Sequence, residues 1–273
     1  MKKIIFIIIV LITLTSCTNK TEDEQPLKVA MDLKFPPFMY LDEDNNPSGL
    51  EVEIAKAFAS YLDRDLEIVN TDFTMLIPSL ESGEVDIIIS DMTITEERKQ
   101  KVDFSSPYRF SKTIAMVNKD FYEENNISDE MKVEEFFNLE GIKPIGLSAT
   151  ISTSIPNSYG VEAVEVSEIA SAIMEINTAL SNVLVGSTTV IQDHFANKNT
   201  TELYFGIPDY FSSGFAVKKG NQELLDQANA FIETLYEENG LYDQLKDKYD
   251  PIIQEYLKND NLGLDYIVQK PER

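Results

Sequence analysis

Residues 85–108 read VDIIISDMTITEERKQKVDFSSPY, and this stretch decides which fold we predict. Its three consecutive isoleucines, residues 87–89, are typical of a strand that is buried on both faces, as in the sheets of α/β proteins. A polar loop follows at residues 90–94. Thr95 is then a favourable N-cap for a short helix with an acidic first turn. The stretch therefore predicts a strand, a polar loop and a helix in direct succession.

Arg98 lies in the first turn of this predicted helix, within a few residues of the hydroxyls of Ser90 and Thr93. Open α/β sheets bind ligands at the carboxyl ends of their strands, and an Arg can hold a carboxylate through two parallel hydrogen bonds. Backbone N–H groups at a helix start also favour an anion. The segment therefore predicts a carboxylate site, although spacing alone equally allows a surface helix in which Arg98 pairs with its own glutamates.

The composition of the 273-residue chain excludes several functional classes, and its length suits one large or two medium domains. With 23 Lys and Arg against 47 Asp and Glu, the formal net charge of −24 excludes a nucleic-acid partner, since no basic surface could neutralise phosphates. We find no phosphate-binding glycine motif, no Cys/His metal set and no G-x-S-x-G motif. A partial calcium-loop match at residues 42–53 has Pro47 where a glycine is required. We therefore expect no cofactor and no metal.

The N-terminus is typical of a lipoprotein. Two lysines precede an apolar run, residues 4–14, which is too short to span a membrane and suits a signal peptide. The run ends in LTSC, a lipobox in which small residues precede Cys17, the single cysteine of the chain. We expect residues 1–16 to be a lipoprotein signal peptide and residues 17–26 a lipidated tether, so that the protein is anchored to a membrane and faces the periplasm or the cell exterior. The alternative is a cleaved, unanchored protein with a free thiol.

Residues 91–108 resemble the signature segment of the periplasmic amino-acid-binding proteins, which are the solute receptors of ABC importers. Three further segments fit this family in the same order, at residues 27–38, 48–57 and 72–82, and residues 213–249 resemble its C-terminal part. The middle of the chain matches less well. The resemblance implies an α/β fold of the periplasmic-binding-protein type, in which two α/β domains are joined by two hinge strands and hold the ligand in the cleft between them.

The resemblance also implies how the chain is divided. We expect a discontinuous first domain at residues 27–112 plus 214–250. The second domain, residues 113–213, would be inserted into it, and residues 251–273 would be a C-terminal extension. Strands at residues 113–117 and 213–217 would be two parallel hinge strands. Residues 121–132 are predicted to form an exposed acidic loop. Periodicity predicts helices at residues 50–62, 74–82, 167–180, 188–197, 222–239 and 241–249. The last helix is expected to break at Asp250-Pro251.

Ligand contacts follow from the same resemblance. Phe35 and Phe73 correspond to the aromatic walls of the family's ligand site, although either could be an ordinary core residue. Ser152 and Thr153 lie where relatives have a Gly-rich turn, and their hydroxyls could bind a ligand or face solvent. The predicted ligand-binding residues are Asp32, Phe35, Phe73, Ser90, Asp91, Thr93, Arg98, Ser152 and Thr153.

Amino-acid-binding relatives usually offer an aspartate to the α-ammonium group of the ligand, after the strand that here covers residues 179–185. This chain has Val185-Gly186-Ser187 there, so the usual anion is missing. Asp91 could take over this contact, with Asp32 as a weaker candidate, or it could pair with Arg98 instead. We expect Asp91 to contact the ligand, and whether the ligand carries an ammonium group is left open.

From these features we predict a lipid-anchored extracytoplasmic solute-binding protein of an ABC importer. It would act as a monomer, close on a small carboxylate such as an amino acid or a close analogue, and deliver it to an ABC permease in the membrane. One alternative is an enzyme resembling the cyclohexadienyl dehydratases, which need a general acid in the cleft. The missing anion at Gly186 argues against this enzymatic function, unless Asp91 or Asp32 acts as the general acid. The other alternative is a ligand sensor for a membrane signalling partner.

Overall fold

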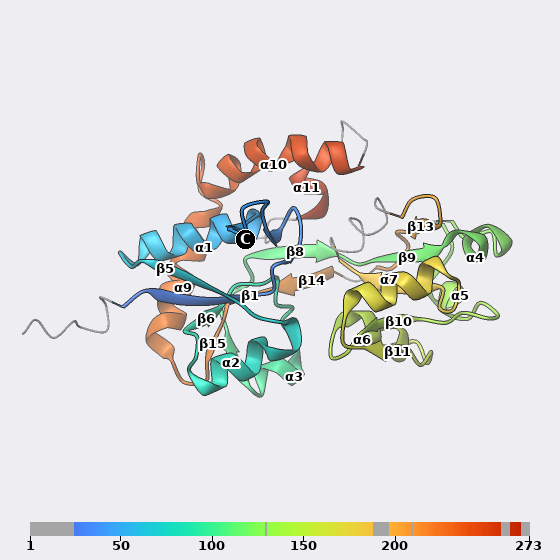
Figure 1. The fold of residues 1–273 in the computed structure, drawn as a ribbon, viewed down its shortest axis with the longest axis horizontal. Helices are drawn as coiled ribbons and strands as arrows, with labels where there is room; N and C mark the ends of the chain where they lie inside the picture. The colour runs from blue at the N-terminus through green and yellow to red at the C-terminus, as the bar shows by residue number, and fades with distance from the viewer. Residues whose placement is uncertain (1–24, 129, 188–196, 209, 258–262, 269–273) are drawn as a thin grey trace, which may run out of the picture.

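The computed structural model describes residues 25–128, 130–187, 197–208, 210–257 and 263–268. Within these ranges, two α/β domains lie side by side along the long axis of the molecule (Figure 1). The predicted signal peptide, Cys17 and the helix predicted from residue 188 fall outside the described residues. In the described part of the chain, every helix is too short or too polar to cross a membrane.

The first domain is built on a five-stranded sheet with the strand order β5-β1-β6-β15-β7. Strands β5, β1 and β6 run parallel, whereas β15 lies antiparallel between β6 and β7. The isoleucines at positions 87–89 are fully buried, as the sequence predicts, because both faces of this sheet are covered. The strands are β1 (Leu27–Met31), β5 (Leu66–Asn70), β6 (Ile87–Ile88), β7 (Val102–Phe104) and β15 (Ala216–Lys218).

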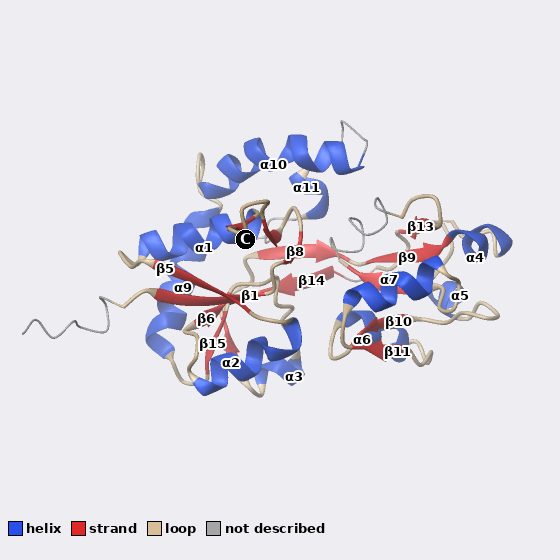
Figure 2. Ribbon diagram, viewed as in Figure 1, coloured by secondary structure: helices blue, strands red, loops and turns tan. Residues whose placement is uncertain are grey.

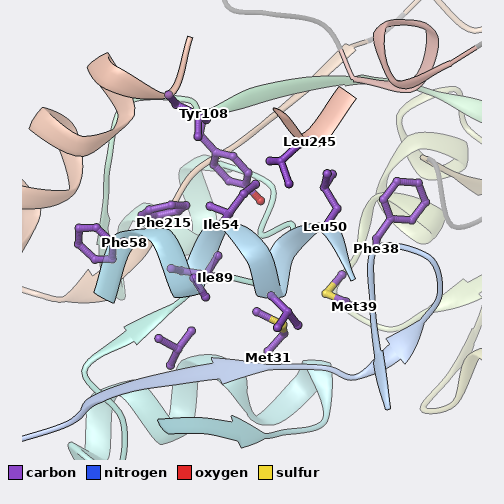
Figure 3. Close-up of a cluster of buried hydrophobic side chains, with 14 of the residues drawn as sticks. Met31, Phe38, Met39, Leu50, Ile54, Phe58, Ile89, Tyr108, Phe215 and Leu245 are labelled. Carbon is purple, nitrogen blue, oxygen red and sulfur yellow. The ribbon is translucent and has the colours of Figure 1, made fainter. Parts of the chain in front are cut away.

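Three helices cover the two faces of this sheet. They are α1 (Leu50–Tyr61) and α9 (Gln222–Leu235) on one face and α2 (Leu76–Ser82) on the other. Figure 3 shows Met31 and Ile89 in the space between the sheet and α1, with Phe58 and Phe215 in the same cluster. Full burial of one such side chain stabilises the fold by about 1.5–3 kcal/mol. The core of the first domain therefore holds the strand that leads into the predicted ligand loop.

The second domain contains an antiparallel sheet with the strand order β12-β9-β13. A parallel pair, β10 with β11, lies beside it. The strands are β9 (Ile114–Asn118), β10 (Ile145–Leu147), β11 (Val164–Val166), β12 (Val183–Gly186) and β13 (Thr201–Tyr204). The helices are α4 (Lys119–Glu124), α5 (Val133–Phe137), α6 (Ile151–Ser158) and α7 (Ile169–Asn177).

Two strands, β8 (Arg109–Lys112) and β14 (Tyr210–Ser213), join the domains (Figure 2). They pair antiparallel, so the expectation of parallel hinge strands is wrong. The reason is that one strand leaves the first domain and the other returns to it, so adjacent segments run in opposite directions. The two strands also precede the segments expected as hinges, residues 113–117 and 213–217, which fall largely in β9 and β15. The returning strand is also divided, since β14 ends at Ser213 and β15 begins at Ala216. The residues at which the domains divide stay a prediction.

Two helices near the C-terminus differ from the prediction in extent. α9 ends at Leu235 rather than at residue 239, and the hydroxyl of Tyr236 donates a hydrogen bond to the carbonyl of Tyr108. α10 (Leu241–Leu257) continues through Pro251, where the sequence predicts a break. A proline removes one helix hydrogen bond, but the side chains of Tyr249 and Ile253, on either side of it, are buried in the core and hold the helix together.

The predicted acidic loop at residues 121–132 is wrong at its start. α4 covers this part and is capped by Asn118, whose side-chain oxygen accepts the N–H of Phe121 over 3.2 Å. Phe121 and Tyr122 pack against the core of the second domain, and Ile127 is buried. Because the segment is rich in acidic residues, its sequence predicts an exposed loop although several of its apolar side chains pack against the core.

The described part of the C-terminal extension, for which the sequence offers no account, packs on the first domain. Its helix α11 (Leu264–Ile267) lies against α10 (Figure 1). The N–H of Leu264 donates to Asp250 over 2.7 Å, and the hydroxyl of Tyr242 donates to Asp265 over 2.8 Å. Leu264 and Val268 are buried in the same core as α1 and α9. This segment is therefore part of the hydrophobic core of the first domain.

Candidate ligand-binding site

A cavity of about 90 Å³ lies between the two domains, and a wider groove of about 640 Å³ adjoins it along α2 and α6. First-domain walls of the cavity come from β2 (Lys34–Phe35), β3 (Met39–Leu41) and the short helix η2 (Phe73–Met75). In the first domain, β3 also pairs with β4 (Pro47–Ser48). The cavity is lined by Phe35, Met39, Phe73, Ser90, Asp91, Thr93, Arg98, Leu147, Thr150, Ile151, Ser152, Ile169, Gly186 and Ser187.

Arg98 belongs to α3 (Glu96–Lys99) and lines this cavity. Thr95 caps the helix as predicted, its hydroxyl oxygen accepting the N–H of Arg98 over 3.2 Å. The guanidinium donates from Nη1 to the carbonyl of Thr93 over 2.8 Å, and from Nη2 to the carbonyl of Ala149, in the second domain, over 2.9 Å. These two bonds hold the guanidinium in place, and its remaining N–H groups can serve a ligand.

The alternative in which Arg98 pairs with its own glutamates is wrong. Glu96 pairs instead with Lys99 over 2.7 Å, and Arg98 forms no ion pair with any carboxylate of the described residues. Its side chain is buried, and this burial lowers the pKa of Arg98 to about 10, so that it stays cationic at neutral pH. A guanidinium that is shielded from bulk solvent and lines a cavity favours an anionic ligand there.

Other predicted residues gather around this guanidinium. The ring centroid of Phe73 is 5.1 Å from the central carbon of the Arg98 guanidinium, which is a cation–π contact. Phe35 at the end of β2 lines the same cavity, as do the buried side chain of Ser90 and Thr93. The structure thus brings both predicted aromatic walls and both predicted loop hydroxyls to one cavity.

Two of the predicted residues lie outside this cavity. Asp32 is buried, accepts the N–H of Phe73 on Oδ2 over 3.0 Å, and donates its own N–H to Ser90 over 3.1 Å. Burial raises the pKa of Asp32 to about 6. Asp32 therefore positions two residues of the cavity wall. Thr153 lines the wider groove, and its hydroxyl donates to the carbonyl of Thr150 over 3.2 Å.

Asp91 has a partner that the sequence analysis missed. Its carboxylate accepts hydrogen bonds from Nε of Arg109 over 3.0 Å and from the hydroxyl of Ser213, and it forms an ion pair with Nη2 of Arg109. The alternative of an Asp91–Arg98 pair is therefore wrong. Because Arg109 begins β8 and Ser213 ends β14, this cluster joins the predicted ligand loop to both hinge strands. A signal was present: a carboxylate in a buried loop requires a cation, and Arg109 directly follows the signature segment.

Glu51 on α1 completes this buried cluster. Its Oε1 lies 3.3 Å from Nη2 of Arg109, and its Oε2 accepts the hydroxyl of Tyr108 over 2.7 Å. Burial raises the pKa of Glu51 to about 7, against the opposing influence of Arg109. For Arg109 itself, burial lowers the pKa, but Asp91 and Glu51 outweigh burial and raise it, so this guanidinium stays charged.

The second-domain wall of the cavity contains three apolar side chains, those of Leu147, Ile151 and Ile169. Thr150, Ser152, Gly186 and Ser187 complete it. Thr150 caps α6: its hydroxyl donates to the carbonyl of Leu147 over 2.7 Å and accepts the N–H of Ser152 over 3.2 Å. Ser152 lines the cavity, in the position that we expected. The sequence does not single out the three apolar residues as part of a site, because hydrophobic periodicity assigns such residues to a core. Within the described ranges, no cluster of His, Cys, Asp or Glu side chains could hold a metal ion.

The model of the bacterial extracellular solute-binding proteins, family 3, matches residues 27–251 of this chain. The chain belongs to this family. This solute-binding protein is 28% identical over 234 residues to the L-arginine-binding protein of Pseudomonas aeruginosa. The alignment covers 83% of this chain and 88% of that protein. It is 27% identical over 236 residues to an L-cystine-binding protein of Escherichia coli, which covers 85% of each chain.

Solved structures place the fold in the same family. An ancestral arginine-binding protein bound to glutamine matches with a TM-score of 0.69 at 30% identity, covering 82% of this chain and 97% of that chain. An ancestral amino acid-binding protein, described as a precursor of cyclohexadienyl dehydratase, matches with a TM-score of 0.68 at 28% identity. This match covers 82% of this chain and 94% of that chain. The predicted family and the predicted fold class are thereby confirmed.

Proposed function

We propose that this solute-binding protein serves an ABC importer as a monomer and binds a small carboxylate, an amino acid or a close analogue, through Arg98. The observation that carries this proposal is the buried guanidinium of Arg98, which lines the interdomain cavity and has only backbone carbonyls as hydrogen-bond partners among the described residues. Membership of the solute-binding family and the likeness to arginine- and cystine-binding proteins support the importer role.

Closure about the two hinge strands is part of this proposal. Arg98 already contacts the second domain through Ala149, so a carboxylate bound to it would touch both domains. Exclusion of water from the closed cavity strengthens the charge interaction. The closing bodies would be residues 27–112 plus 214–250 and residues 113–213, and the closed form would present the surface that the ABC permease recognises.

Substitution of Arg98 tests the proposal. The full chain, purified in detergent, is screened by thermal shift against amino acids, dicarboxylates and 2-oxo acids, and calorimetry gives the affinity of each positive compound. We expect Arg98→Ala to abolish the stabilisation by ligand, and Arg98→Lys to bind poorly because an ammonium cannot reproduce the planar fork. Lys99→Ala on the same helix is the matched control, since Lys99 is exposed and pairs only with Glu96. Unchanged affinity in Arg98→Ala would overturn the site.

Lipid anchoring at Cys17 is a separate proposal that rests on the apolar run at residues 4–14 and the LTSC sequence after it. We expect the full chain to enter the membrane fraction and to incorporate labelled palmitate in the producing cells. Cys17→Ser should abolish both. Membrane retention of the serine variant at the wild-type level would contradict a lipid anchor at this residue.

A cyclohexadienyl dehydratase is the second candidate, favoured by the likeness to the ancestral precursor of that enzyme. Such a reaction needs a general acid at the cavity. Among the described residues, Asp91 is the single carboxylate that lines the cavity, and it is already paired with Arg109. The geometry therefore supports binding better than catalysis. Turnover of prephenate by the wild-type protein would reverse this order.

A further inference from the structure

A ligand held by Arg98 meets one carboxylate in the cavity wall of the described residues, that of Asp91. This carboxylate already accepts hydrogen bonds from Nε of Arg109 and from the hydroxyl of Ser213, and it forms an ion pair with Nη2 of Arg109. Arg109 is 1% exposed, and turning away from Asp91 would leave its buried charge with only Glu51 as an ion-pair partner among the described residues. The negative charge of Asp91 is therefore compensated before any ligand arrives.

The second carboxylate of this cluster, that of Glu51, is not accessible to a ligand. Glu51 is fully buried behind Arg109, outside the cavity wall, and its oxygens face Arg109 and the hydroxyl of Tyr108. Burial also raises its pKa to about 7, which weakens its negative charge near neutral pH.

The other polar groups at the cavity offer no substitute for a carboxylate partner. The carbonyls of Thr93 and Ala149 already accept hydrogen bonds from the Arg98 guanidinium, whose charge repels an ammonium. Gly186 and Ser187 carry no charge. Three hydroxyl residues, Ser90, Thr150 and Ser152, also line the cavity and carry no charge. The remaining wall residues are apolar, namely Phe35, Met39, Phe73, Leu147, Ile151 and Ile169.

We propose that the site selects carboxylates with an apolar body and no ammonium group, of the class of the aliphatic 2-oxo acids, over the α-amino acids with the same carbon skeleton. This inference rests on the proposed function, because it takes Arg98 as the anchor of the carboxylate. The apolar wall encloses the body of such a ligand. An ammonium group at the same place loses its hydration and gains no uncompensated carboxylate in return.

Calorimetry with matched pairs of ligands tests this selectivity on the full chain in detergent. The members of each pair differ only in the group next to the carboxylate: α-ketoisocaproate with L-leucine, α-ketoisovalerate with L-valine, and pyruvate with L-alanine. We expect the pair that fits the cavity best to show the 2-oxo acid binding at least tenfold more tightly than the amino acid.

Two variants of Ser187 connect the selectivity to the missing charge. Ser187→Asp places a carboxylate at the cavity wall, and we expect it to shift the preference at least tenfold toward the amino acid. Ser187→Asn has nearly the same shape as Ser187→Asp but no charge, and we expect it to shift the preference much less than Ser187→Asp does. If Ser187→Asp keeps the wild-type ratio of affinities, the absence of an acidic partner does not set the selectivity, and the inference is overturned.

The outcomes separate this inference from the proposed function. An L-amino acid that binds the wild type more tightly than its 2-oxo acid, with binding lost in Arg98→Ala, overturns the inference and leaves the proposed function intact. If no carboxylate binds, or if binding persists in Arg98→Ala, the proposed function fails and the inference fails with it.

Discussion

Nη2 of Arg98 donates a hydrogen bond to the carbonyl of Ala149 over 2.9 Å, and this bond crosses the cavity from the first domain to the second. Ala149 has a φ of 58°, in the left-handed region that disfavours residues with a Cβ. A second bridge between the domains, Lys34 to Glu168 over 3.5 Å, is solvent-exposed and contributes little. The guanidinium that we propose as the ligand anchor therefore also takes part in the contact between the domains.

Small-angle scattering should show the wild-type protein becoming more compact when it binds its carboxylate, because the ligand joins both domains at Arg98. Arg98→Ala should show no such change at the same ligand concentration. Lys34→Ala is the control: it removes the exposed bridge to Glu168 and should keep the compaction. Compaction of Arg98→Ala to the wild-type radius of gyration would contradict the role of Arg98 in closure.

Asp91→Asn should destabilise the folded protein by about 3–5 kcal/mol, because it leaves the buried guanidinium of Arg109 without its main partner. Urea unfolding followed by circular dichroism measures the change. Asp63→Asn is the matched control: Asp63 is exposed and has a φ of 54°, close to the 47° of Asp91. A loss of stability no larger than that of the control would show that the Asp91–Arg109 pair does not hold the loop.

The free energy of unfolding should fall as the pH rises from about 4.5 to about 7, in part because of Glu51. Its pKa is raised from 4.5 to about 7 by burial, so between these values the folded protein binds a proton that the unfolded chain releases. One such group changes stability by at most about 1.4 kcal/mol per pH unit. Asp32, with a pKa of about 6, adds to the same trend at lower pH.

Glu51→Gln should therefore flatten this pH dependence, as measured by urea unfolding at steps between pH 4 and pH 8. Glu255→Gln is the control, because Glu255 is exposed on α10 and its substitution removes the same formal charge. The comparison cancels the general effect of the acidic surface. Equal slopes in the two variants would mean that Glu51 does not contribute.

Leu264→Ala should cost about 2–5 kcal/mol of stability, since it removes a fully buried side chain and leaves a cavity beneath α10. The affinity for ligand should stay unchanged, because α11 contributes no residue to the cavity wall. Glu255→Ala, on the exposed side of α10, serves as the control in thermal unfolding. A melting temperature equal to that of the control would show that the C-terminal extension does not contribute to the core.

A fragment of residues 27–112 should not fold by itself. It lacks β15, the strand that lies between β6 and β7, and it lacks α9, which covers one face of the sheet. Circular dichroism should show no cooperative thermal transition, in contrast to the full chain under the same conditions. Cooperative melting of the fragment would contradict the discontinuous first domain.

Local features followed from the sequence alone. Isoleucines 87–89 predict a buried strand because consecutive β-branched residues suit a sheet that is covered on both faces. The cap of α3 needs only Thr95 and the N–H of Arg98, three residues later, so neighbouring letters suffice to predict it. The family could also be assigned from the order of a few short segments. The match of the family model over residues 27–251 confirms that assignment.

Only the tertiary structure decided what Asp91 pairs with. Its partner Arg109 is 18 residues away along the chain, and Ser213 is 122 residues away, on the strand that returns from the second domain. Sequence periodicity shows which face of an element is buried, but it does not show which side chains of distant elements meet. The role of a buried carboxylate depends on the nearest buried cation, and the packing of the hinge strands against the ligand loop places that cation beside Asp91.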